Sequence, residues 1–343
     1  MAEIINRMLM DGFYEILPWE KLSGCNILVT GATGLIGSSV VDLLMQVPRL
    51  DFHVYASGRN EERARVRFSK YFQSEYFHFL KYDVEDALSS DVDFHYIIHA
   101  ASNASPNFFA KNPVGVILAN ILGVKNLLDY GKKHSLRRFL YVSSGEVYGN
   151  GDKEKWDEHD SGYVDCMTMR SCYPTSKRAA ETLCVAYAKQ FGIDVVVARP
   201  CHTYGPNFTN SDNRAFAEFF RNVLKGEDIV LKSKGEQYRS WIYVEDCACA
   251  ILTLLLKGDS CEAYNIANEE SCVTIRSLAE QIAQLGGVKL TFELPSDMER
   301  QGFSVIKKAT FDTSKLQELG WFPKYSLKEG LKITYNSLKK SLG

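Results

Sequence analysis

The stretch that decides the fold is Cys25-Asn-Ile-Leu-Val-Thr-Gly31-Ala-Thr-Gly34-Leu-Ile-Gly37. Its first six residues are a short apolar run, which predicts a strand, and residues 38–45 carry apolar side chains at helical spacing. A strand, a glycine turn and a helix can bind a pyrophosphate, because glycines admit it and the helix N-terminus attracts its charge. The spacing is G-x-x-G-x-x-G, not G-x-G-x-x-G, so a glycine-rich turn that binds nothing is the alternative. The cofactor residues expected here are Gly31, Thr33, Gly34, Leu35, Ile36 and Gly37.

Further strands follow at the intervals typical of a parallel sheet, with helical patterns at 114–132 and 178–190. The expected strands are 52–56, 96–100, 138–143 and 194–198. This alternation predicts a doubly wound, Rossmann-type α/β domain, in which the ligand binds beyond the carboxyl ends of the strands. The residues at those ends, and so expected near a cofactor, are Ser57, Arg59, Asp83, Val84, Ala100, Ala101, Ser102 and Pro200.

The end of the second strand bears on the choice between NAD and NADP. An acidic residue there would bind the adenosine ribose and favour NAD, but Ser57-Gly58-Arg59 stands in its place. Arg59 could receive a 2′-phosphate, so NADP stays open, or it could stack on adenine or begin the solvated run 60–67. NAD is preferred because of the reaction type described below.

Tyr173 and Lys177 lie four residues apart, downstream of the glycine turn. On a helix this spacing puts both side chains on one face, where the ammonium can favour the phenolate. A free tyrosine has a pKa of about 10, too high for a base at neutral pH, so it needs such a neighbour. The pair therefore predicts oxidoreduction, although the motif alone is common.

Composition indicates an ordinary globular protein. With 45% hydrophobic residues, 24% charged residues and a net charge of −2, the chain can bury a full core and offers no broad basic surface for nucleic acid. No apolar run approaches the roughly 20 residues that span a bilayer, and no secretory signal begins the chain, so no membrane partner and a cytoplasmic location are expected. The nine cysteines suit a reducing compartment, and no zinc spacing is present, so no metal is expected.

With these residues in place, the chain resembles the extended short-chain dehydrogenase/reductase family of nucleotide-sugar enzymes, almost to its C-terminus. Within that family it is most similar to UDP-glucuronate decarboxylases. The matching segments are Gly31-x-x-Gly34-x-x-Gly37, Asp83-Val84, His99-Ala-Ala-Ser102, Ala104-Ser105-Pro106, Asn120, Ser143-Ser144-Gly-Glu146-Val-Tyr-Gly149, Arg170-Ser-Cys-Tyr173-x-x-x-Lys177-Arg-Ala-Ala-Glu-Thr182, Arg199-Pro200-Cys-His202-Thr-Tyr-Gly-Pro206, Arg239, Tyr243-Val-x-Asp246 and Leu319-Gly-Trp-x-Pro323.

The resemblance implies a tightly held NAD and a transient 4-keto sugar. Tyr173 would take the proton of the sugar 4-hydroxyl, Ser144 would hold that hydroxyl, and Lys177 would bind the nicotinamide ribose and lower the pKa of Tyr173. Glu146 would act near C5 or C6, and Arg239 would grip the diphosphate through its forked donors. Asn120 is expected near the cofactor, and Ser105 and His202 near the substrate.

Two departures bear on the reaction. Gly145 stands where family dehydratases carry an acidic Asp and decarboxylases usually carry Ser, so loss of water from C6 is disfavoured. His202 replaces a family Asn; it could donate to the substrate or be a polar loop residue. Decarboxylation of UDP-glucuronate to UDP-xylose therefore comes first, and 4-epimerisation or 4,6-dehydration next. An NADP-dependent sugar reductase and a non-catalytic dinucleotide-binding regulator are the alternatives of other classes.

The expected organisation has an N-terminal arm and two lobes. Residues 1–23 form the arm, residues 24–200 and 241–262 the NAD-binding Rossmann domain, and residues 201–240 and 263–343 a smaller nucleotide-sugar-binding lobe. The resemblance also implies a homodimer, in which the helices 114–132 and 178–190 pair across a two-fold axis, with the small residues Ala179, Ala180, Ala186 and Ala188 offered for close approach.

Overall fold

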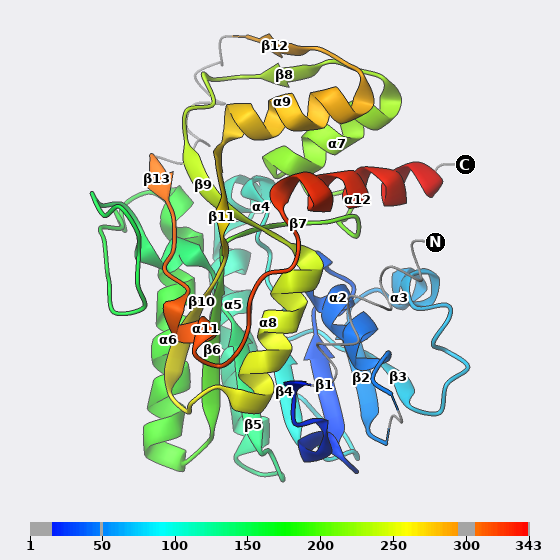
Figure 1. Cartoon of the computed structure of the whole chain (residues 1–343). Helices are drawn as coiled ribbons and strands as arrows, with labels where there is room; N and C mark the ends of the chain where they lie inside the picture. The colour runs from blue at the N-terminus through cyan, green and yellow to red at the C-terminus, as the bar shows by residue number, and fades with distance from the viewer. Residues whose placement is uncertain (1–15, 49–50, 294–305, 342–343) are drawn as a thin grey trace.

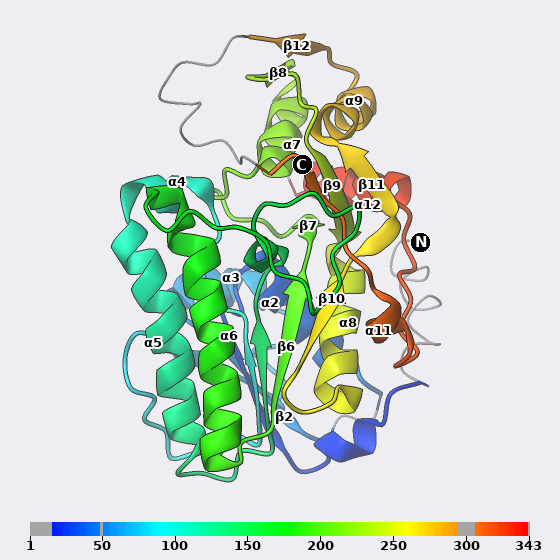
Figure 2. The same ribbon diagram turned by 90° about the vertical axis from the view of Figure 1, so that its left-hand side faces the viewer.

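The computed structural model describes residues 16–48, 51–293 and 306–341. The main body is a seven-stranded parallel sheet with helices on both faces, and a smaller lobe lies above its carboxyl edge (Figures 1 and 2). The predicted Rossmann-type fold is therefore confirmed. The strand order is β10-β6-β5-β4-β1-β2-β3. These strands are β1 (Asn26–Thr30), β2 (His53–Gly58), β3 (Phe77–Lys81), β4 (Tyr96–His99), β5 (Arg138–Val142), β6 (Val195–Pro200) and β10 (Glu262–Ile266).

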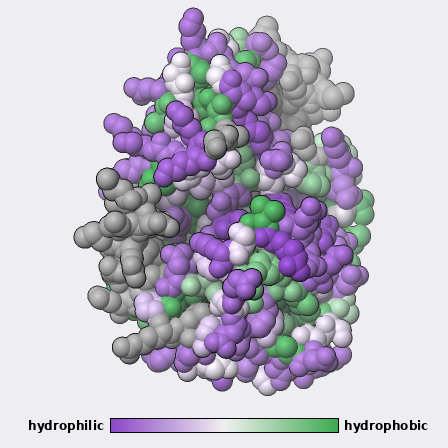
Figure 3. All heavy atoms as spheres, turned by 90° about the vertical axis from the view of Figure 1, so that its right-hand side faces the viewer, coloured by the Kyte–Doolittle hydropathy of each residue, from purple (hydrophilic) through white to green (hydrophobic). Residues whose placement is uncertain are grey.

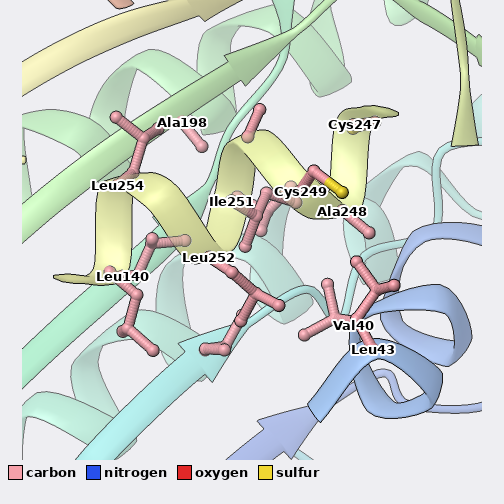
Figure 4. Packing of buried hydrophobic residues seen from close by; sticks show 14 of the residues in the cluster. Val40, Leu43, Leu140, Ala198, Cys247, Ala248, Cys249, Ile251, Leu252 and Leu254 are labelled. Carbon is pink, nitrogen blue, oxygen red and sulfur yellow. The ribbon is translucent and has the colours of Figure 1, made fainter. Parts of the chain in front are cut away.

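The helices of the main body pack on the sheet or on one another. They are α2 (Leu35–Leu44), α3 (Glu61–Arg67), α4 (Pro106–Lys111), α5 (Pro113–Gly131), α6 (Cys172–Phe191), α8 (Val244–Lys257) and α11 (Ser314–Gln317). The 3-10 helices are η1 (Trp19–Leu22), η2 (Gly145–Tyr148) and η3 (Met169–Ser171). On one face α8 lies beside α2, where Ile251, Leu252 and Leu254 meet side chains of α2, β5 and β6 (Figure 4). Burial of such aliphatic side chains, about 1.5 to 3 kcal/mol each, holds this layer on the sheet.

The smaller lobe has its own core between helices and short strands. Its helices are α7 (Ala215–Lys225), α9 (Ile275–Gly286) and α12 (Leu327–Lys340). Its strands are β7 (His202–Tyr204), β8 (Ile229–Leu231), β9 (Tyr238–Tyr243), β11 (Asn268–Thr274), β12 (Leu290–Phe292) and β13 (Lys308–Ala309). β7, β11 and β13 pair with β9, and β8 pairs with β12. The strand β9 therefore connects the smaller lobe to the main body, because it continues directly into α8.

The strand β3 was not predicted, and its position explains why. It is the edge strand of the sheet, and only Phe77 of its five residues is buried. A short edge strand with one buried residue lacks the apolar pattern by which strands are found in a sequence. The strand β10 also lies in the main sheet and runs to Ile266, past the expected boundary at 262. The domain boundaries otherwise remain predictions.

Two expectations about long segments meet the structure differently. The helix α5 has 19 residues with mean hydropathy 1.2, so an apolar run of nearly membrane-spanning length does exist, contrary to the expectation. Half of its most apolar window is buried inside the protein, and it packs beside α6 (Figure 2), as a core helix of an α/β domain does. Of the expected N-terminal arm, residues 1–15 lie outside the described residues; Leu17 is buried in the main core.

The face at the right of Figure 1 is mainly hydrophilic (Figure 3), with apolar side chains in small groups. The side chains of α3 at this face fit that description: Arg65 pairs with Glu61, and Val66 is exposed among charged neighbours. Single exposed apolar residues are normal on a protein surface.

Candidate active site

A cavity of about 330 Å³ follows the carboxyl edge of the sheet, from the glycine turn to Tyr173. Most of the predicted cofactor residues line it, together with one predicted substrate residue, Ser105. The lining residues that the sequence indicated are Gly31, Thr33, Gly34, Leu35, Ile36, Gly37, Ser57, Arg59, Asp83, Val84, Ala100, Ala101, Ser102, Ser105, Tyr173 and Lys177. Asn120, Pro200, Ser144, Glu146, His202 and Arg239 are not among the lining residues.

The glycine turn is built so tightly that only glycine fits. A Cβ on Gly31, whose φ is +65°, would lie 2.7 Å from the Ala100 carbonyl oxygen, and one on Gly37 would lie 2.4 Å from the Gly31 carbonyl oxygen. α2 begins directly after Gly34, so the first N–H groups of the helix face the cavity end of β1. Free N–H groups at a helix N-terminus are the partners that a phosphate needs.

At the end of β2 the structure brings two arginines to the cavity. Arg59 is 62% exposed and lies 3.7 Å from the Asp83 carboxylate. Arg63, one helical turn later on α3, donates to the Thr33 carbonyl oxygen at 2.5 Å and was not predicted. The Ser57 hydroxyl is buried and has no hydrogen-bond partner among the described residues. A buried hydroxyl without a partner beside a cavity suits a polar ligand group.

Asn120 supports the cavity wall from behind. Its side chain accepts a hydrogen bond from the Ser102 hydroxyl at 2.8 Å and donates to the Ser176 hydroxyl at 2.9 Å. Asn120 is buried on α5, whereas Ser176 belongs to α6. The predicted residue thus ties these two helices to the strand end at Ser102, and its direct contact with a cofactor remains a prediction.

Tyr173 and Lys177 both lie on α6, as their spacing predicted, and both are buried. Lys177 donates to the Val142 carbonyl oxygen at 2.9 Å, and its Nζ is 5.8 Å from the centre of the Tyr173 ring. Burial raises the pKa of Tyr173 to about 12, with the Glu146 charge adding to it, while a hydrogen bond with Ser144 lowers it. Lys177 is not among the groups that lower this pKa, so the expected lowering by Lys177 is not found, and removal of the phenolate from water dominates the shift.

Lys177 itself is strongly affected by its site. Burial lowers the pKa of Lys177 to about 7, against an upward effect of the Glu181 carboxylate. Glu181 in turn accepts from the Ser143 hydroxyl at 2.5 Å and from Arg199 at 2.7 Å. This carboxylate is the anion that favours the charged form of Lys177 near the reacting end of the cavity.

Glu146 forms an ion pair that the sequence did not indicate. Arg170 Nη2 lies 2.7 Å and 2.8 Å from the two Glu146 carboxylate oxygens. The Arg170 guanidinium lies 4.7 Å from the centre of the Phe109 ring, and Phe109 stacks on Tyr173 at 4.9 Å. Arg170 was part of the motif around Tyr173, but only the fold places it against η2.

Gly145 is explained by a residue far along the chain. A Cβ at this position would lie 2.5 Å from Phe311 Cζ, so the tip of the Phe311 ring occupies the space of a side chain. Phe311 is buried against Tyr148, with ring centres 5.5 Å apart. The departure from the family at 145 therefore has a packing partner in this chain.

The two remaining predicted substrate residues lie in the lobe. The His202 ring packs on Trp241 at 5.2 Å; its Nδ1 has no partner among the described residues, and burial beside Arg239, Arg214 and Arg170 lowers its pKa to about 3. His202 is therefore uncharged at neutral pH. Arg239 is 4% exposed and donates to the carbonyl oxygens of residues 238, 306 and 307, so part of its donor set is already used. Its grip on a diphosphate remains a prediction.

The lobe also contributes residues that the sequence did not single out. Arg214 and Asp212 line the cavity from the loop before α7, and Arg214 Nη2 lies 2.5 Å from the Asp212 carboxylate. The Ser105 hydroxyl bonds the Asn213 side chain, which connects this loop to the start of α4. The loop follows the last residue of the family motif at 206 and has no pattern of its own, so no sequence signal marked it.

The residues present fit a dinucleotide. The glycine turn admits a pyrophosphate. The buried Ser57 hydroxyl, which has no hydrogen-bond partner among the described residues, lies beside the cavity, and the Tyr173–Lys177 pair lies at the other end of the cavity. Gly31, Gly34, Gly37 and Ser57 would hold such a cofactor at one end, and Lys177 at the other. This arrangement defines a dinucleotide-binding α/β protein with a buried tyrosine–lysine pair at the end of its cavity.

Comparison with known proteins leads to the same conclusion, a dinucleotide-binding α/β protein. Residues 27–267 match the model of the NAD-dependent epimerase/dehydratase family. The chain is 35% identical to UDP-glucuronic acid decarboxylase 6 of Arabidopsis thaliana over 94% of its own length and 91% of that protein. It is 34% identical to UDP-glucuronic acid decarboxylase 1 of Xenopus tropicalis over 92% of its length and 72% of that protein. This protein belongs to the NAD-dependent epimerase/dehydratase family, whose cofactor is NAD.

A solved structure extends the likeness to the whole fold. The UDP-glucose 4-epimerase of Thermotoga maritima, determined with UDP-glucose, covers 93% of this chain and all of that one, with a TM-score of 0.80 and 27% identity. The chain is thus an enzyme of this family, and the residues of its active site determine which reaction it catalyses.

Proposed function

We propose that this enzyme decarboxylates UDP-glucuronate to UDP-xylose through a transient 4-keto sugar. The observation that carries the proposal is the grouping of Ser144 and Glu146 near Tyr173, which lines the end of the dinucleotide cavity. The Ser144 hydroxyl accepts a hydrogen bond from the Glu146 N–H at 3.2 Å, and both side chains affect the pKa of Tyr173, which Glu146 raises and Ser144 lowers. The similarity to UDP-glucuronic acid decarboxylases over most of the chain supports the same reaction.

The chain's own residues divide the work as follows. When bound, NAD would accept the hydride of the sugar C4 and later return it there. Tyr173 takes the proton of the 4-hydroxyl, which Ser144 holds, and Lys177 lies close enough to stabilise the resulting charge. The 4-ketone makes the C6 carboxylate a β-keto acid, so the C5–C6 bond breaks, carbon dioxide leaves and the electron pair passes to the ketone oxygen. Glu146 would act at C5, where a proton from solvent takes the place of the lost carboxylate. As the hydride returns to C4, Tyr173 gives its proton back to the C4 oxygen, which restores the 4-hydroxyl.

The second candidate is 4-epimerisation. It ranks above 4,6-dehydration for a structural reason. Gly145 has no side chain, and Phe311 fills its space, so nothing at 145 can protonate the 6-hydroxyl that leaves in a dehydration. A 4-epimerase needs no group at C5, and the likeness to the Thermotoga maritima UDP-glucose 4-epimerase covers 93% of the chain. The same absence at 145 disfavours 4,6-dehydration.

Product analysis separates these reactions. The purified enzyme is incubated with UDP-glucuronate, UDP-glucose and UDP-xylose, and products are identified by mass and then by NMR. Loss of the mass of carbon dioxide from UDP-glucuronate is expected. Glu146→Gln should still reduce bound NAD when substrate is added, seen by the absorbance of reduced cofactor, but should fail to complete the turnover. A Gln variant with wild-type turnover would move epimerisation to first place.

We also propose that the enzyme is a homodimer. α5 and α6 lie side by side on one flank (Figure 2), and apolar side chains are exposed along them. The most exposed are Val114, Ile117, Leu118, Val185 and Phe191. Exposed apolar side chains gathered on two adjacent helices suit a two-fold contact. Light scattering at micromolar concentration is expected to give twice the 38.7 kDa of one chain.

A cytoplasmic location is proposed as well. All nine cysteines lie within the described residues, and each is a free thiol, which suits a reducing compartment. Fractionation of the native host, with the enzyme followed by antibody, tests this.

A further inference from the structure

A series of side-chain contacts runs from Tyr173 through Phe109 and Arg170 to Glu146. Tyr173 of α6 stacks on Phe109 of α4 with ring centres 4.9 Å apart and 25° between the planes. The Arg170 guanidinium covers Phe109 at 4.7 Å, and its Nη2 bonds both oxygens of Glu146 in η2. These contacts therefore connect Tyr173 with Glu146, and the proposed reaction assigns a separate step to each of the two. Arg170 itself does not line the cavity.

The charges around Tyr173 show what Arg170 does electrostatically. The Glu146 carboxylate raises the pKa of Tyr173, whereas Arg214 and Arg170 lower it. Lys177 on the same helix and Tyr141 on β5 also face the phenol. Glu146 is thus the one carboxylate among the described residues that is found to oppose ionisation of Tyr173, and Arg170 is bonded directly to it.

We propose that Arg170 is a positioning residue of this enzyme: it fixes the Glu146 carboxylate in place and neutralises its charge beside Tyr173. The inference rests on the proposed function of these two residues. The enzyme needs a carboxylate near C5 and an ionisable phenol at the 4-hydroxyl, and an unpaired carboxylate would hinder the phenol. Arg170 allows both groups to stand in one site.

The geometry favours arginine for this role. The side chains of Arg170 and Glu146 are 25% and 26% exposed, so solvent screens the pair less than a surface pair. A planar guanidinium can stack on Phe109 while one nitrogen bonds the carboxylate, whereas a lysine ammonium supplies the charge without the planar contact. Arg170→Lys should therefore keep part of the effect, and Arg170→Gln should lose it.

The first step can be followed separately from the later ones. The readout is the single-turnover rate at which substrate reduces the bound NAD of the holoenzyme, measured against pH. This rate rises with pH as Tyr173 ionises. Loss of Arg170 leaves the Glu146 charge uncompensated, which raises the pKa of Tyr173 and moves the rise to higher pH. For Arg170→Gln we expect a shift of about one pH unit and a rate about tenfold lower at neutral pH.

The double variant tests the coupling to Glu146. In Arg170→Gln/Glu146→Gln both charges are gone, so the rise should return towards its wild-type position. Absorbance titration of tyrosinate, with each variant compared with the same variant carrying Tyr173→Phe, gives the shift without turnover. Arg276→Gln, which removes a half-exposed arginine paired with Glu280, is the matched control and should leave the profile unchanged.

Two results would overturn the inference: an Arg170→Gln profile that coincides with the wild type, or an equal shift in the single and double variants. If Arg170→Gln does not fold, an Arg170→Lys variant whose pH profile and rate both match the wild type would overturn it equally. Failure of the proposed function is distinguishable, because the wild-type enzyme would then release no carbon dioxide from UDP-glucuronate, whatever the tyrosinate titrations of the Arg170 variants show.

Discussion

Replacement of Gly145 tests whether Phe311 determines which residue can stand at this point of the site. A Cβ at 145 would lie 2.5 Å from Phe311 Cζ and 3.0 and 3.1 Å from its neighbours, where ordinary contact begins at 3.4 Å. The ring must move by about 1 Å, yet Phe311 is only 2% exposed and packed on Tyr148. Overpacking of this kind costs about 1 to 3 kcal/mol, and we expect Gly145→Ala to lower the free energy of unfolding by that amount.

The decisive measurement is a double-mutant cycle with Phe311→Leu. The smaller side chain costs roughly 1 to 2 kcal/mol by itself, but it makes room for a Cβ at 145, so the double variant should be more stable than the sum predicts by about 0.5 to 3 kcal/mol. Stabilities come from urea unfolding of the holoenzyme. Gly226→Ala is the control, since its Cβ meets nothing within 4 Å and its φ of +73° makes it costly for another reason. Strict additivity of Gly145→Ala and Phe311→Leu would refute the packing explanation.

Three further predictions concern the cofactor turn and the buried pair. Tyr173→Phe should lower kcat by about 10² to 10⁴-fold while NAD binding, followed by fluorescence titration, stays intact, because the ring still packs on Phe109 but exchanges no proton; retention of a third of wild-type kcat would remove Tyr173 from the mechanism. Gly37→Ala should abolish the thermal stabilisation that added NAD gives to the apoenzyme, because its Cβ would lie 2.4 Å from the Gly31 carbonyl oxygen, and an unchanged NAD-induced rise in Tm would contradict this. Burial lowers the pKa of Lys177 to about 7, so between pH 7 and its ordinary value near 10.4 the unfolded chain binds the extra proton and stability rises with pH, by at most about 1.4 kcal/mol per pH unit. Lys177→Met should remove that part of the rise. The difference in urea midpoint between the apo wild type and the variant should therefore not be the same at pH 7 as at pH 9.5. An equal difference at both pH values would show that Lys177 is not the group responsible.

Local patterns were enough for the fold and for the pair on α6. The glycine turn, the apolar strands and the four-residue spacing of Tyr173 and Lys177 depend on residues close in sequence, and the periods of strand and helix are set by backbone geometry. Their placement along one cavity also followed, since parallel strands end at the same edge of a sheet. The glycine turn and the Tyr173–Lys177 pair could therefore be placed at one edge of the sheet from the sequence alone, whereas β3 between them could not be predicted.

Contacts between distant segments were beyond the sequence. Arg170 meets Glu146 across 24 residues, Phe311 meets Gly145 across 166, and Arg214 reaches the cavity from a loop without a pattern. No period or spacing encodes such pairs, because they arise only when separate elements pack.

The sequence by itself determined the fold class and the identity of the chemical groups, and the tertiary structure decided their chemical state. Tyr173 was expected to have a lowered pKa because a lysine stands four residues away, yet its pKa is about 12. Lys177 was expected to be a charged neighbour, yet its own pKa falls to about 7. Both differences have one physical reason. The sequence states which charges are near, but the cost of removing a charge from water depends on all the atoms that surround it in the folded chain.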